Sequence, residues 1–112
     1  MNPDQQSALE ELRKAVSEQK LAFLPHEPVD PAFAGLHQAV SHYDRLVSQL
    51  VMETLQNIET RVTPGELPQA QSEVDQQFAG LDAGVQPKAG VYRNYAGRLK
   101  RMHTLVATVR GW

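Results

Sequence analysis

The sequence predicts an all-α protein, an antiparallel up-down four-helix bundle with a long second helix. Between residues 31 and 62, apolar residues recur three and four positions apart, which is the period of an α-helix. Clusters of proline and glycine separate three further segments with the same periodicity. No segment shows the strict alternation of apolar and polar residues that is typical of a half-buried strand.

The second predicted helix, residues 31–62, is expected to lie at the centre of the bundle. Asp30 can cap it, Pro31 suits the first helical position, and Thr63-Pro64-Gly65 should end it. Its apolar face covers about half of its circumference, which is too wide for a single partner helix. The apolar positions are Phe33, Leu36, Val40, Tyr43, Leu46, Val47, Leu50, Val51, Leu55, Ile58 and Val62. Because this helix is much the longest, it could project and help to build a dimer.

The first predicted helix has Asn2 as its cap and Pro3 at its first position, and it ends near Lys20. Its narrow apolar stripe consists of Leu9, Leu12 and Val16. An apolar patch, residues 21–24, follows, and prolines at 25, 28 and 31 exclude a regular helix after it. We expect this patch to pack over one end of the core, the alternative being a lip that binds a partner.

The third predicted helix begins at Pro64 or Pro68, two starts that the sequence leaves open, and it ends at Gly84. Its buried side consists of Leu67, Val74, Phe78 and Leu81. The fourth helix is predicted over residues 91–109, with Gly111 as its stop. Its apolar face consists of Val91, Tyr95, Leu99, Met102, Leu105, Val106 and Val109.

The composition indicates one domain, residues 1–112, with an ordinary globular balance of 41% hydrophobic and 21% charged residues. The absence of cysteine excludes disulfides, thiolate catalysis and cysteine-built zinc sites. The first residues lack the basic and apolar regions of a signal peptide, and no apolar run approaches the roughly 20 residues that cross a bilayer. We therefore expect a cytoplasmic protein that does not enter a membrane.

The charge is distributed unevenly along the chain. Residues 1–82 carry all 13 acidic residues and five basic ones, a net −8, whereas residues 83–112 carry six basic residues and no acid. The basic last helix could contact nucleic-acid phosphates, with Tyr92 stacking on bases, or it could complement the acidic helices of its own bundle. The residues of this candidate interaction surface are Arg93, Lys100, Arg101, Arg110 and Trp112.

The histidines do not form a metal-binding pattern. His37 and His42 are five positions apart and therefore lie on different faces of a helix, and no Glu-x-x-His motif is present. We expect neither a metal nor another cofactor. His42 is the candidate for phosphotransfer, although Arg45 and Leu46 replace the lysine at +3 and the small residue at +4 that histidine phosphotransfer domains carry.

Asp44 lies at the flank of the apolar face of the second helix. A carboxylate at the margin of a core needs a partner, because leaving it unpaired costs several kcal/mol. We expect Asp44 to meet Arg98, His37 or a tyrosine hydroxyl. Such a polar core pair fixes the register of two helices; the alternative is a ligand-binding acid.

The sequence contains no nucleophile-elbow motif and no phosphate-binding glycine loop. It therefore favours a non-enzymatic helical protein that binds another protein or itself, as a homodimer, an adaptor or a small chaperone. The first alternative is a nucleic-acid-associated protein that uses the basic last helix and Trp112. The second is a phosphotransfer or small-ligand role at His42 or Asp44.

Overall fold

The computed structural model describes residues 1–19 and 22–112, and this part of the chain contains helices and no strand. The four α-helices are α1 (Pro3–Gln19), α2 (Ala34–Leu55), α3 (Glu66–Ala79) and α4 (Gly90–Arg110). Two short 3-10 helices, η1 (Pro31–Phe33) and η2 (Gln86–Ala89), lead into α2 and α4. Lys20, the predicted end of the first helix, and Leu21, the start of the apolar patch, lie outside the described residues.

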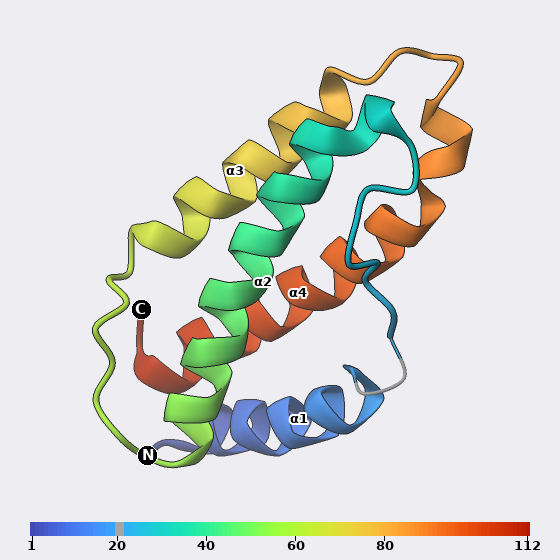
Figure 1. Cartoon of the computed structure of the whole chain (residues 1–112). Helices are drawn as coiled ribbons and strands as arrows, with labels where there is room; N and C mark the ends of the chain where they lie inside the picture. The colour runs from blue at the N-terminus through green and yellow to red at the C-terminus, as the bar shows by residue number, and fades with distance from the viewer. Residues whose placement is uncertain (20–21) are drawn as a thin grey trace.

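Successive helices run in alternating directions, which confirms the four-helix bundle (Figure 1). The central helix is α2, which packs against α3 on one side and α4 on the other. The first helix, α1, packs along α4 and makes few contacts with α2. The arrangement therefore leaves one side of α2 only partly covered by helices.

The core is centred on α2, as its broad apolar face predicts. Tyr43, Val40 and Leu50 of α2 are completely buried. They share one core with residues from every other helix, namely Leu12, Leu67, Val74, Leu99 and Val106. Burying a side chain of this kind contributes about 1.5–3 kcal/mol, so this cluster is the main source of stability of the fold.

The end of α2 differs from the prediction. The helix stops at Leu55, not at residue 62, and the next turn closes with Asn57 at φ 56. The Asn57 N–H donates to the Thr54 carbonyl at 3.2 Å, and the Ile58 N–H donates to the Glu53 carbonyl at 3.0 Å. This pair of bonds is a Schellman motif, which asparagine permits because it tolerates left-handed backbone. The early stop makes the burial predicted for Ile58 wrong, since that side chain is 50% exposed.

The same correction applies to the length of the second helix. With 22 residues, α2 is only one residue longer than α4, which has 21. The expectation that it is much the longest helix is therefore wrong. Dimerisation through a projecting second helix loses its basis.

The other helix ends are set by local hydrogen bonds. Asn2 and Gln5 form a reciprocal capping box at the start of α1, with distances of 2.8 and 3.0 Å, as the cap at Asn2 predicts. The third helix begins at Glu66, whose carboxylate accepts from the Thr63 N–H, so neither predicted proline start is correct. Pro68 is tolerated because it lies in the first turn, where the backbone N–H has no intrahelical partner.

The third helix also ends earlier than predicted, at Ala79 with Gly80 as its C-cap, whereas Gly84 lies in the following turn. By contrast, α4 matches its predicted limits within one residue at each end. Gly111, with φ 74, ends it in the left-handed conformation that favours glycine.

The buried face of α4 is rotated relative to the prediction. Tyr92 and Ala96 are buried, whereas Tyr95 and Leu105 are only partly buried. The Tyr92 ring packs at 5.5 Å from that of Phe33. The shift occurs because α4 lies against both α1 and α2, so its buried face combines two contacts.

Candidate functional site

Asp44 is paired with a tyrosine hydroxyl, one of the three partners expected for it. The Tyr95 hydroxyl on α4 donates to Asp44 Oδ1 at 2.9 Å, and the Ser48 hydroxyl donates to the same oxygen at 3.2 Å. Burial and then the bond to Asp44 raise the pKa of Tyr95 to about 12. The phenol therefore remains a donor at physiological pH, and the bond fixes α2 against α4.

Arg98 and His37, the other residues of the predicted polar core pair, each have a different partner. The Arg98 guanidinium donates to the Glu18 backbone carbonyl on α1 at 3.3 Å. His37 Nδ1 lies 2.9 Å from the hydroxyl of the buried Tyr92. His37 and Asp44 therefore both bond tyrosines of α4, while Arg98 connects α4 to α1.

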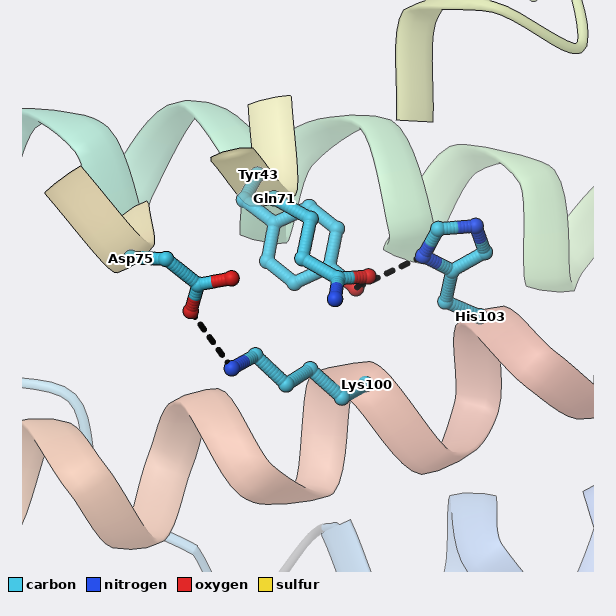
Figure 2. A network of polar contacts seen from close by, with 5 residues as sticks. All are labelled: Tyr43, Gln71, Asp75, Lys100 and His103. Carbon is cyan, nitrogen blue, oxygen red and sulfur yellow. Dashed lines mark hydrogen bonds and ion pairs between the residues drawn. The ribbon is translucent and has the colours of Figure 1, made fainter. Parts of the chain in front are cut away.

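A second polar network, which the sequence did not predict, connects α2, α3 and α4 (Figure 2). The completely buried Tyr43 places its hydroxyl 2.8 Å from His103 Nδ1 and 3.4 Å from Gln71 Oε1. Close by, Lys100 pairs with Asp75 at 2.6 Å. Burial lowers the pKa of His103, which favours its neutral form.

The position of His103 could have been found from its spacing. It follows the buried Leu99 by four residues and precedes the buried Val106 by three, which places it on the inner stripe of α4. Tyr92 and Tyr95 of α4 contact polar groups of α2, and Tyr43 of α2 contacts His103 of α4, so the three hydroxyls form a series of bonds along the α2–α4 interface.

The basic residues of the candidate interaction surface contact their own chain. Three of them have partners on other segments: Arg93 binds the Gln86 carbonyl at 2.8 Å, Lys100 pairs with Asp75, and Arg101 pairs with Glu18 at 3.2 Å. The expectation that Tyr92 stacks on bases is wrong, because Tyr92 is completely buried.

Arg110 and Trp112 lie together beyond the end of α2. Arg110 Nε donates to Thr54 Oγ1 at 2.8 Å, and Nη2 donates to the Ile58 carbonyl at 3.1 Å. The guanidinium also lies 5.9 Å from the ring of Trp112, which is 41% exposed. Both side chains thus belong to the surface where the C-terminus meets α2.

His42 is exposed on α2, and it lines a polar hollow of about 450 Å³ with Arg45 and with Glu73 of α3. This setting combines opposite charges and leaves the ring open to solvent. Within residues 1–19 and 22–112, no group of three metal-ligating side chains comes together. His42 belongs to neither of the two polar networks.

A polar cleft of about 490 Å³ lies between the proline-rich segment and the partly covered side of α2. Its walls are formed by residues 22–26 on one side and by His37, Ser41, Asp44, Arg45 and Tyr95 on the other. From the predicted apolar patch, Leu24 packs against the core, whereas Phe23 is 67% exposed. The cleft offers one carboxylate, one guanidinium and two imidazoles, a mixture that suits no single class of ligand.

Two hollows lie between α1 and α2, the first mainly apolar and the second of mixed polarity. The first, of about 260 Å³, is lined by Val16, Gln19, Ser48, Val51, Met52 and Met102. The second, of about 450 Å³, lies where the termini approach the end of α2 (Figure 1), and its apolar lining consists of Met1, Leu9, Leu55, Ile58, Val109 and Trp112. On α2, Val51 and Leu55 are one turn apart, so the hollows adjoin, and we call them together the α1–α2 groove.

Four of the six exposed large apolar side chains in the described part of the chain line the groove, whereas Phe23 and Val29 lie outside it. Met1 is 65% exposed, Met52 60%, Ile58 50% and Trp112 41%. Sequence reasoning missed this surface because it placed Ile58 in the core and Trp112 among basic residues. The available signal was Asn57, which ends α2 and turns Ile58 outward.

In the described part of the chain, no helix is both long enough and apolar enough to cross a membrane. The function of the chain has to be inferred from its own surfaces, since family models, curated proteins and solved structures provide no significant match to it.

Proposed function

We propose that this chain is a non-enzymatic helical module that binds a segment of another protein in the α1–α2 groove. The observation that supports the proposal is the gathering of Met1, Met52, Ile58 and Trp112 around two adjoining hollows. Monomeric proteins rarely expose contiguous apolar patches of large side chains unless the patch serves an interaction. Four such side chains in one groove therefore favour a docking role.

The groove also has the energetics of a binding surface. Complete burial of a Met, Ile or Trp side chain contributes about 1.5–3 kcal/mol. A side chain that is half exposed in the free protein can therefore still gain roughly half of that free energy when a partner covers it. A partner that covers all four would gain several kcal/mol before the entropy of association is subtracted. Met52 and Trp112 are also residue types that adapt to, or dominate, protein interfaces.

The contacts of the basic residues favour their structural interpretation over nucleic-acid binding. Lys100 and Arg101 form ion pairs with Asp75 and Glu18, which belong to the acidic helices of the same bundle. Nucleic-acid-binding proteins usually concentrate uncommitted cations on one face. The α1–α2 groove therefore supports a function better than the basic face of α4 does.

Site-specific photo-crosslinking tests the proposal in the cells that naturally make the protein. A photoreactive residue at Met52 lies in the groove, whereas the same residue at Ser72, exposed on α3, is the matched control. We expect ultraviolet light to produce a discrete protein adduct from position 52 that position 72 does not give. Absence of an adduct at position 52, or identical adducts from both positions, would refute the proposed function.

A further inference from the structure

We infer that the occupant of the α1–α2 groove is an amphipathic α-helix of a different protein, with acidic residues beside its apolar face. This inference rests on the proposed function, because it names the partner of the same groove. It is drawn from the shape of the groove, its charge and the symmetry that a second copy would impose.

The shape of the groove suits a short helix. From Ser48 to Leu55 the groove follows two turns of α2, about 10 Å at 1.5 Å per residue, and Ile58 and Trp112 extend it beyond the helix end. Strand addition is not open to an extended peptide, because the described residues contain no strand whose edge could pair with it. A helix satisfies its own backbone, so three turns with apolar residues at i, i+3 and i+7 would fill the groove.

The charge of the groove is positive. Arg13 and Arg110 line it, and no acidic side chain does so in the part of the chain that the structure describes. Arg13 is exposed, and the Arg110 guanidinium is held by Thr54 Oγ1 and the Ile58 carbonyl, both of which are neutral. The Glu53 carboxylate of α2 interacts with the Arg110 charge, so the exposed Arg13 is the groove cation that would attract acidic residues on the occupant.

Symmetry disfavours a second copy of this chain as the occupant. A twofold dimer brings the same patch of each copy face to face. Groove-to-groove contact would then bring together two surfaces whose described lining contains Arg13 and Arg110 and no acidic side chain, and charges of like sign across an interface are unfavourable. A different protein with a complementary acidic helix avoids this repulsion.

Titration with two designed peptides tests the inference, and Trp112 provides the signal because it is the only tryptophan of the chain. Both peptides are 14-residue capped helices without aromatic residues, with leucine at i, i+3 and i+7. One has glutamate at the flanking positions, and the other has lysine there. We expect a saturable blue shift of Trp112 emission with the glutamate peptide and about tenfold weaker binding of the lysine peptide. The difference in affinity between the two peptides should become smaller as the salt concentration rises.

Three variants separate the groove from the rest of the surface. M52E should abolish binding of the glutamate peptide, and the matched control S72E, on α3, should not. R13E should weaken binding of the glutamate peptide about tenfold and favour the lysine peptide. Equal binding of the two peptides, no saturable shift with either, or an unchanged preference in R13E would overturn the inference.

The crosslinking experiment at Met52 distinguishes this failure from failure of the proposed function. An adduct with twice the mass of the chain would identify a second copy as the occupant and overturn the acidic-helix inference, while the docking role of the groove would stand. If position 52 gives no adduct, the proposed function itself fails. An adduct with a different protein, whose contacting segment is an acidic amphipathic helix, would support both.

Discussion

Replacing Tyr43 by phenylalanine tests whether the polar network between α2, α3 and α4 stabilises the fold. The variant Y43F keeps the buried ring and removes only the hydroxyl, which lies 2.8 Å from His103 Nδ1 and 3.4 Å from Gln71 Oε1. A typical hydrogen bond contributes about 0.5–1.5 kcal/mol, and a buried partner left unsatisfied adds about 1–3 kcal/mol. Because His103 and Gln71 are only partly buried, we expect a total loss of about 1–2 kcal/mol.

Thermal unfolding followed by circular dichroism measures this loss. An unfolding entropy of about 2.1 cal/mol/K per residue over 112 residues converts the loss into a fall in Tm of about 4–8 °C. The same measurement on S48A, which removes an exposed hydroxyl bonded to Asp44, serves as the control and should show a loss below about 0.5 kcal/mol.

A double-mutant cycle with H103A assigns the effect to the contact itself. If the hydroxyl acts through His103, Y43F should lose at least about 0.5 kcal/mol less in the H103A background than in the wild type. An unchanged free energy of unfolding in Y43F, or the same loss in both backgrounds, would show that the contact between Tyr43 and His103 does not stabilise the fold.

Three further predictions concern titration, backbone conformation and the buried face of α4. Because burial lowers the pKa of His103, the unfolded chain binds a proton at a higher pH than the folded chain, so the free energy of unfolding falls as the pH drops below about 6.5. Urea unfolding at pH 7.5 and pH 5 should therefore show a smaller decrease in the free energy of unfolding for H103N than for the wild type, and equal decreases would contradict this. Residue 57 has φ 56, a left-handed conformation that glycine adopts readily and alanine does not. In urea unfolding, N57A should therefore lower the free energy of unfolding by about 1 kcal/mol and N57G should hardly change it, and equal losses would exclude the proposed helix end. In urea unfolding, L99A should lower the free energy of unfolding by about 2–5 kcal/mol, and L105A should lower it clearly less, since Leu105 is only partly buried. The reverse order would contradict the orientation of α4.

Helix periods and caps could be read from the sequence because they depend on neighbouring residues. Asn2 and Gln5 form their capping box within one turn, and Tyr43 and Leu50 are buried because apolar periodicity marks an inner face. The end of α2 could not be read in this way. The apolar period continues through Ile58 and Val62, and Val62 does return to the core after the turn at Asn57, so periodicity alone does not show the break.

The sites depend on which helices become neighbours, and that information is not local. Asp44 was expected to find a partner, but which of the alternatives it meets depends on the rotation of α4 that brings Tyr95 beside it. The α1–α2 groove exists because α1 packs on α4 and leaves Met52 exposed beside the buried Val51. The stripe of Leu9, Leu12 and Val16 predicts an inner face of α1, but only Leu12 is completely buried, whereas Leu9 and Val16 line the α1–α2 groove.

The rate at which a thiol at position 52 reacts in the free protein tests most directly whether the α1–α2 groove is open for binding. The chain has no cysteine, so M52C carries the only thiol, and S72C on α3 supplies an exposed reference. With both variants folded and dilute, we expect a neutral thiol reagent to modify M52C within about threefold of the rate for S72C, because exposure governs thiol access. A rate for M52C more than about tenfold below that of S72C, with unchanged helicity, would show that the groove is closed in solution and does not serve as a docking surface.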